Sequence, residues 1–215
     1  MNQILSNTAS VAARSKGFVG IRNTEQRYGL LAIFLHWLVA LVVIGMFSLG
    51  VWMTGLTYYD EWYKRGPDIH KSIGILLFLV MLVRVIWRIL NVKPKHDPRV
   101  GSLQIRVAHG VHLLLYGLIF AMIVSGYLIS TADGRPVEVF GLFSVPATIT
   151  GIANMEDVAG EVHWYLALLL ISLVALHTIA ALKHHFINRD RTLEKMLGVR
   201  TQIKTKFHQP KERIQ

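Results

Sequence analysis

The stretch Gly160-Glu-Val-His-Trp-Tyr-Leu-Ala-Leu-Leu-Leu-Ile-Ser-Leu-Val-Ala-Leu-His-Thr-Ile-Ala-Ala-Leu-Lys183 is an almost unbroken apolar run that carries two histidines, His163 and His177. A run of about 20 apolar residues is long enough to cross a bilayer as one α-helix. The two histidines are fourteen positions apart. At about 100° and 1.5 Å per residue, they project from nearly the same helix face, roughly 21 Å apart along the axis. Two imidazoles placed in this way predict two metal centres, whose other ligands come from elsewhere in the chain.

Three further apolar runs have a similar length. The 215-residue chain is 53% hydrophobic and 17% charged, whereas soluble domains carry about 25% charged residues. This composition is typical of a membrane protein. We therefore predict an all-α membrane protein, a four-transmembrane-helix bundle that holds its cofactors between facing helices. The expected spans are approximately 29–53, 69–91, 104–130 and 160–185.

Two connections have features of their own. The first ends in Gly66-Pro67-Asp68, and Pro and Asp both favour the first positions of a helix, so the second span is expected to start there. The third connection, about 131–159, is the longest and contains an apolar segment, 136–146. Such a segment is expected to cover the bundle or to lie along the membrane surface, and a lid over a site is the alternative.

The formal net charge of +10 is distributed unevenly. Most Lys and Arg residues lie in the N-terminal segment, the second connection and the C-terminal segment, whereas the first and third connections hold only Lys64, Arg65 and Arg135. The positive-inside rule then predicts that both termini lie in the cytoplasm. We expect a disordered tail over 1–27, the membrane domain over 28–187 and a basic tail over 188–215. Because the charges follow the topology, we expect lipid and not nucleic acid as the partner of the basic segments.

The chain contains no cysteine and ten histidines. The absence of cysteine excludes disulfides, zinc or iron–sulfur sites built on thiolates, and covalent attachment of a c-type haem. Histidine is therefore the first candidate for a metal ligand.

The membrane histidines form two pairs when they are sorted by depth. His70 and His163 lie near the periplasmic ends of the second and fourth spans, and His36 and His177 lie in the cytoplasmic halves of the first and fourth. Two histidines fill both axial positions of a haem iron, an arrangement that suits electron transfer. Hydrogen bonds between helices are the alternative. Zinc or copper is less favoured, because neither pair has a third or fourth ligand nearby.

Arg84 lies fourteen positions beyond His70 on the same helix face. A guanidinium there could pair with a buried anion such as a haem propionate, or it could extend to the headgroups. His109 is a candidate contact for a propionate or a quinone. The sequence leaves the roles of three further histidines open: His112, His184 and His185. Of these, His184 shares the helix face of His177 and is an alternative ligand.

Taken together, these motifs resemble those of the bacterial cytochrome b561 family over about residues 27–195. The resemblance rests on the spacing of His163 and His177 and on the following motifs: Leu35-His36-Trp37, Ile69-His70, Arg84-x-x-x-Arg88, Ala108-His109-x-x-His112, Gly141-Leu-Phe-x-x-Pro146 and Lys183-His184-His185. The family is similar in plan to the cytochrome b subunits of formate dehydrogenase and nickel–iron hydrogenase.

The resemblance implies a cytochrome b of the bacterial inner membrane with two haem b groups. By this resemblance His36 and His177 bind the cytoplasmic haem iron, and His70 and His163 bind the periplasmic one. One branch of the family is an oxidoreductase that oxidises superoxide in the periplasm and reduces ubiquinone, and we expect this activity here. The alternative is an anchor subunit that relays electrons between a periplasmic dehydrogenase, hydrogenase or carrier protein and quinone.

Overall fold

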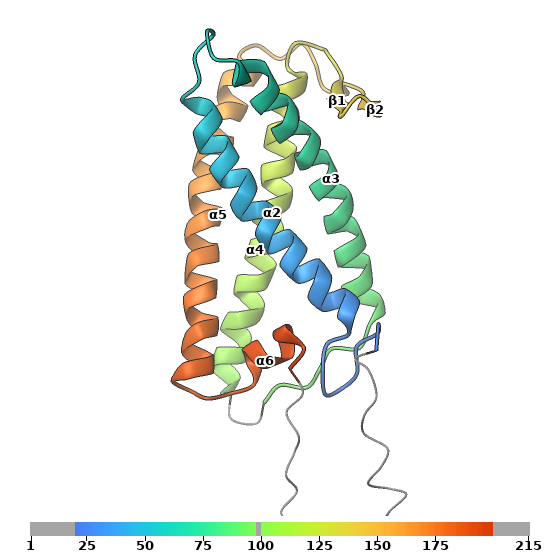
Figure 1. The fold of residues 1–215 in the computed structure, drawn as a ribbon, viewed down its shortest axis with the longest axis vertical. Helices are drawn as coiled ribbons and strands as arrows, with labels where there is room; N and C mark the ends of the chain where they lie inside the picture. The colour runs from blue at the N-terminus through green and yellow to red at the C-terminus, as the bar shows by residue number, and fades with distance from the viewer. Residues whose placement is uncertain (1–19, 98–99, 200–215) are drawn as a thin grey trace, which may run out of the picture.

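The computed structural model describes residues 20–97 and 100–199, which form a bundle of four long helices in up-down-up-down order (Figure 1). All four are long and apolar enough to cross a membrane. The predicted all-α, four-helix membrane architecture is therefore confirmed. The helices are α2 (Leu30–Thr54), α3 (Trp62–Leu90), α4 (Ser102–Thr131) and α5 (Met155–Phe186).

Helix α3 begins at Trp62, seven residues before the expected start of the second span. The prediction that Gly66-Pro67-Asp68 starts this helix is wrong, because Pro67 lies inside it. Proline removes one backbone hydrogen bond, but the helix gains packing before that point. Gly66 is buried, and a β-carbon built on it would lie 3.5 Å from both Met53 and Trp52 of α2. Contact with the end of α2 thus stabilises the first turns of α3, which local sequence rules place outside the helix.

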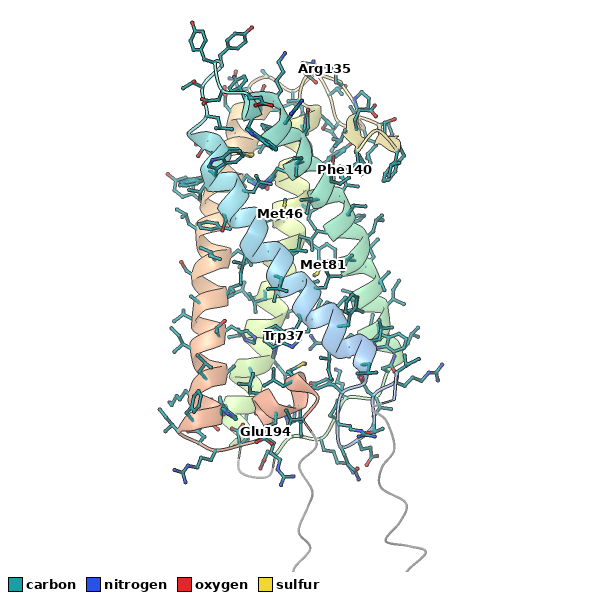
Figure 2. All side chains as sticks on the ribbon, in the orientation of Figure 1. Trp37, Met46, Met81, Arg135, Phe140 and Glu194 are labelled. Carbon is teal, nitrogen blue, oxygen red and sulfur yellow. The ribbon has the colours of Figure 1, made fainter. Side chains whose placement is uncertain are left out.

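The core lies at mid-height of the bundle, with α2 packed along α3 and α4 packed along α5. Met81 is only 1% exposed and lies inside the bundle, as its labelled side chain shows in Figure 2. Apolar side chains also cover the outer surface, where Leu113 is 76% exposed, as expected for a surface that faces lipid. Along α5 the buried residue Leu170 lies between His163 and His177. The buried cluster contains residues of all four helices: Val39, Val43, Leu77, Met81, Leu118, Ile119 and Leu170.

A short antiparallel hairpin, β1 (Val137–Val139) and β2 (Phe143–Val145), lies at one end of the bundle, which we call the hairpin end (Figure 1). Its turn has positive φ at Phe140 (50°) and Gly141 (69°), a conformation that favours glycine. Val139 is fully buried, and β1 packs against α3. The first strand of this apolar segment thus covers part of the bundle, whereas Leu142 and Phe143 remain exposed.

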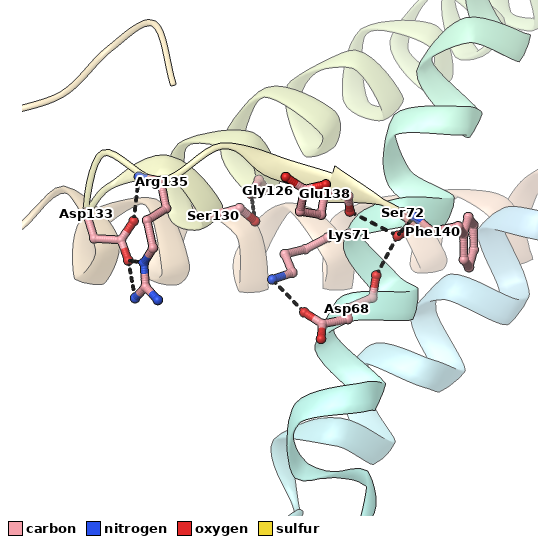
Figure 3. Close-up of polar contacts among 9 residues, drawn as sticks. All are labelled: Asp68, Lys71, Ser72, Gly126, Ser130, Asp133, Arg135, Glu138 and Phe140. Atoms are coloured by element: carbon pink, nitrogen blue, oxygen red, sulfur yellow. Dashed lines mark hydrogen bonds and ion pairs between the residues drawn. The ribbon is translucent and has the colours of Figure 1, made fainter. Parts of the chain in front are cut away.

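Ser72 of α3 fixes this hairpin (Figure 3). Its hydroxyl accepts a hydrogen bond from the Phe140 amide (3.1 Å) and donates to the Asp68 carbonyl (2.8 Å). We predict that Ser72→Ala destabilises the hairpin locally by about 1–3 kcal/mol, because the Phe140 amide loses its partner. Faster amide hydrogen exchange over 137–145 would show this.

The matched control for this variant is Ser48→Ala, since the Ser48 hydroxyl donates only within α2, to the Ile44 carbonyl. Unchanged exchange of the hairpin in Ser72→Ala would contradict the role of Ser72.

The opposite end of the bundle, which we call the α6 end, holds the short helix α6 (Thr192–Leu197) and the described parts of both terminal segments. The predicted tails lie partly outside the described residues, at 1–19 and 200–215. Residues 20–27, expected to be disordered, contact the second connection instead. Asn23 donates to the Val92 carbonyl (3.0 Å), and Lys95 forms a 2.6 Å ion pair with Glu25. These contacts attach residues 20–27 to the membrane domain.

Candidate haem-binding sites

The hairpin-end pair consists of His70 on α3 and His163 on α5. Their ring centres lie 6.2 Å apart and their planes are inclined by 70°. Helices α3 and α5 are not among the closely packed helix pairs, so the two imidazoles meet across the interior of the bundle. A cavity of about 220 Å³ lies beside them and is lined mainly by apolar side chains.

Two glycines allow these rings to sit close to neighbouring helices. A β-carbon on Gly126 of α4 would lie 3.2 Å from Cε1 of His163, closer than ordinary packing allows. A β-carbon on Gly50 of α2 would lie 3.4 Å from Cε1 of His70. Each ring therefore lies close to the backbone of a neighbouring helix, at a glycine that has no side chain to block it.

Polar contacts differ between the two rings of this pair. Nδ1 of His163 lies 2.9 Å from the hydroxyl oxygen of Ser125. Nδ1 of His70 is buried and has no hydrogen-bond partner among the described residues. One ring is thus oriented by a hydrogen bond, and the other is held by packing.

The α6-end site brings three imidazoles together. The rings of His36 on α2 and His177 on α5 have centres 6.4 Å apart and planes inclined by 70°. His112 of α4 lies closer still to His177, with ring centres 5.2 Å apart. The expected pair is therefore adjacent, and a third histidine, whose role the sequence left open, lies beside it.

The separation of the rings distinguishes between these combinations. An imidazole nitrogen binds a first-row metal at about 2 Å, and its ring centre lies about 1 Å behind it, so two imidazoles on opposite sides of one iron have centres about 6 Å apart. The pairs His70/His163 (6.2 Å) and His36/His177 (6.4 Å) fit this distance. The pair His112/His177, at 5.2 Å, is shorter.

Two opposed imidazoles are a donor set that suits a flat haem, and at the hairpin end Gly50 and Gly126 also leave the rings room beside the helix backbone. Within residues 20–97 and 100–199, no group of three or more His, Asp or Glu side chains has the arrangement of a metal site. The pairs therefore fit the group that needs two axial nitrogens better than they fit tetrahedral zinc.

Arg84 lies at the α6-end site, as its depth predicted. Its Nη2 is 3.1 Å from Nδ1 of His36, and its Nε donates to the hydroxyl of Tyr116 (2.8 Å). The Arg88 guanidinium lies 5.2 Å from the centre of the same Tyr116 ring. Arg88 lies in the last turn of α3 and Arg84 about one turn further in. An arginine inside a membrane helix is costly without a negative partner.

A cavity of about 150 Å³ opens beside this cluster, and its lining is rich in hydrogen-bond donors and contains no carboxylate. The polar residues that line it are Asn23, Tyr28, His36, Arg84, Trp87, Arg88, Lys93, His96, His109, His112 and Tyr116. His109 packs edge-on against His96 of the second connection, with ring centres 5.5 Å apart. Such a lining suits a ligand that offers oxygen acceptors.

His184 has a different role from the alternative one considered for it. Its Nδ1 makes a very short hydrogen bond to Asp190, which lies in the turn between α5 and α6. Burial disfavours the charge of Asp190, but hydrogen bonds from Thr192 and His184 outweigh this effect and hold the carboxyl pKa below its usual value. The pair connects the end of α5 to α6, and His184 is not in ring contact with His36.

Sequence reasoning missed three members of these sites: Ser125, Tyr116 and the contact of His112 with His177. Ser125 stands next to Gly126 in the sequence, and small residues of this kind indicate close helix approach or room for a flat cofactor, not a hydrogen bond to a particular histidine. Tyr116 carries one signal that could have been used, because a tyrosine in the middle of an apolar helix usually has a partner for its hydroxyl.

Comparisons with known proteins identify the family of this chain. Residues 27–199 match the family model described as prokaryotic cytochrome b561. Cytochrome b561 homolog 2 of Escherichia coli K12 is 49% identical over 176 residues, which cover 82% of this chain and 94% of the relative.

Two further relatives are more distant. The probable superoxide oxidase CybB of Yersinia pestis is 30% identical over 175 residues, 80% of this chain and 97% of its own. Cytochrome b561 homolog 1 of Escherichia coli K12 is 25% identical over 182 residues, 80% of this chain and 97% of its own. The matches confirm the resemblance found in the motifs, and the chain belongs to the prokaryotic cytochrome b561 family, the multi-pass bacterial membrane proteins that transfer electrons with haem b.

Proposed function

We propose that this protein carries electrons across the bacterial inner membrane on two haem b groups, between a periplasmic donor and the quinone pool. His70 and His163 would be the axial ligands at the hairpin end, and His36 and His177 those at the α6 end. The observation that carries the proposal is that each pair has its ring centres slightly more than 6 Å apart, at opposite ends of one bundle.

The two imidazoles of each pair decide what chemistry the site allows. A haem iron with two histidine ligands cycles between its ferric and ferrous states and has no vacant position for O₂. The chain supplies the remaining requirements. Its apolar core lies between the two levels, glycines let the two rings at the hairpin end lie close to neighbouring helices, and Ser125 contacts the His163 ring.

At the α6 end, Arg84 and His109 are proposed to contact a haem propionate or the head group of ubiquinone. The donor-rich cavity beside His36 supports this proposal, because both ligands present oxygen acceptors to it. The two arginines would compensate the charge of a carboxylate in a setting where an unpaired cation is costly.

We further propose that the α6 end and both termini face the cytoplasm, and the hairpin end faces the periplasm. The distribution of Lys and Arg supports this orientation. The first and third connections of the sequence contain no Lys or Arg other than Lys64, Arg65 and Arg135, and most basic residues in the part of the chain that the structure describes lie at the α6 end.

Superoxide is the proposed donor, in keeping with the name of the Yersinia pestis relative. The overall reaction would convert two superoxide anions, one ubiquinone and two protons into two O₂ molecules and one ubiquinol. Superoxide needs no binding pocket beyond access to the edge of the hairpin-end site, because its electron can transfer without a bond to iron.

The charges at the hairpin end favour the second function, an anchor subunit that receives electrons from a periplasmic protein. The basic residues near the hairpin end are Lys64, Arg65, Lys71 and Arg135. Three of these four are paired with carboxylates: Arg65 with Glu61 (3.1 Å), Lys71 with Asp68 (2.9 Å) and Arg135 with Asp133. No salt bridge of the described residues reaches Glu138, Glu156, Asp157 or Glu161. An acidic surface of this kind attracts a basic partner and repels a small anion.

A single experiment separates the two functions. The purified protein alone is exposed to potassium superoxide, with and without superoxide dismutase, and then to a short-chain ubiquinone. We expect the absorption spectrum of a b-type haem. The spectrum should show that superoxide reduces the haem, that dismutase prevents this reduction, and that quinone reoxidises the haem. Reduction that strictly requires a second protein would contradict the superoxide activity and would support the anchor function.

A further inference from the structure

We propose that Ser125 positions His163 as a haem ligand, by fixing which ring nitrogen carries the proton. This inference rests on the proposed function, because it assumes that His163 binds iron. Ser125 lies on α4, facing α5, and is only 4% exposed. Its hydroxyl oxygen lies 2.9 Å from Nδ1 of His163 and 3.0 Å from the carbonyl oxygen of Met122.

The two contacts of Ser125 determine the direction of each hydrogen bond. A serine hydroxyl has one hydrogen to donate, and the Met122 carbonyl can only accept. The Ser125 hydroxyl therefore donates to Met122 (3.0 Å), and its oxygen accepts a hydrogen bond from Nδ1–H of His163. With the proton on Nδ1, the lone pair of a neutral imidazole is on Nε2, the nitrogen available to a metal.

Backbone geometry restrains the same ring from the adjacent position. Gly126 leaves so little space that a β-carbon would lie 3.2 Å from Cε1 and 3.5 Å from Nδ1 of the imidazole. The absence of a side chain at Gly126 therefore lets the ring lie close to α4, next to Ser125. Ser125 and Gly126 thus set the tautomer and the position of His163 together.

The partner ring has no equivalent. Nδ1 of His70 is buried without a hydrogen-bond partner among the described residues. A histidine ligand whose other nitrogen donates a hydrogen bond is more basic and better oriented. His163 is therefore the ligand whose electronic character the protein sets through hydrogen bonds, and Ser125 is the side chain that contributes one, next to the Met122 backbone.

This hydrogen bond should change the midpoint potential of the iron in a definite direction. A hydrogen bond from Nδ1–H shifts electron density toward Nε2, which stabilises ferric iron more than ferrous iron. Loss of the contact should therefore raise the midpoint potential of the hairpin-end haem and leave the other haem unchanged. Removing an outer-shell partner of this kind typically weakens metal binding by about 10- to 100-fold.

The test is a redox titration of the full-length protein carrying Ser125→Ala, with haem content measured on the same sample. We expect one of the two haems to titrate at a higher potential and to be lost about 10-fold more readily to a haem-binding competitor such as apomyoglobin. The α6-end haem of the same sample reports that the bundle has folded. Ser172→Ala is the matched control, because the Ser172 hydroxyl donates only within α5, to the Leu168 carbonyl.

Ser125→Thr keeps a hydroxyl and should restore both the potential and the retention of haem. Ser125 also lines an apolar cavity of about 590 Å³. Wild-type potentials and haem retention in Ser125→Ala would overturn this inference, while a loss of one haem in His163→Ala would still support the proposed function. If His163→Ala keeps both haems, the ligand assignment itself fails.

Discussion

Replacing His163 by alanine should leave the protein with one haem, and replacing His177 should remove the other haem instead. Each variant removes one imidazole from a pair whose ring centres lie 6.2 or 6.4 Å apart and which we propose to bind one haem iron. A b-type haem has no covalent link to the protein, so loss of a ligand in an apolar bundle leaves little to retain it. The pyridine haemochrome assay, normalised to protein, should fall from two haems to one in each variant.

His112→Ala tests whether the distances were interpreted correctly. The His112 ring is closer to His177 than the His36 ring is, at 5.2 Å, and a choice of ligands by proximity alone would select His112. Because two imidazoles on one iron need about 6 Å between ring centres, we expect His112→Ala to keep two haems. Loss of a haem in His112→Ala, together with its retention in His36→Ala, would reverse the assignment at the α6 end.

Gly126→Ala and Gly126→Val should progressively displace the hairpin-end haem. The first added carbon would lie 3.2 Å from Cε1 of His163, so the imidazole or α4 must move. A valine adds two further methyl groups on the same side. We expect reduced retention of one haem in the alanine variant and its loss in the valine variant, measured by haem content and by transfer to apomyoglobin.

Gly117→Ala is the matched control on the same helix, since no atom lies within 4 Å of its β-carbon position. Alanine is the better helix former by about 1 kcal/mol, so Gly117→Ala should keep both haems and raise thermal stability slightly. Equal haem retention in the Gly126 and Gly117 variants would contradict the close approach of α4 to His163.

Much of the fold follows from the length and position of the apolar runs. A segment of 25 or more mostly apolar residues has few stable forms other than a membrane helix. The ends of the helices follow less directly. Pro67 was a reasonable start signal for α3, but packing of Gly66 against α2 extends the helix beyond it. Local rules do not include that tertiary contact.

The histidine pairs could be predicted because depth in a membrane follows from position along each span. His36 and His177, and likewise His70 and His163, share a level for this reason alone. Lateral neighbours could not be predicted in the same way. Which face of α4 turns toward α5 depends on how side chains of both helices interdigitate, and that rotation brings Ser125 to His163 and His112 to His177.

The sequence by itself therefore determined four membrane helices and two levels of paired histidines, because hydrophobic length and helical rise act within single segments. Only the tertiary structure decided the separation of the rings, the contact of Arg84 with His36 and the hydrogen bond that orients His163. These contacts depend on how the helices rotate and how closely they approach one another. An apolar helix surface can face either lipid or another helix, so the packing of small residues and the pairing of polar groups select one arrangement.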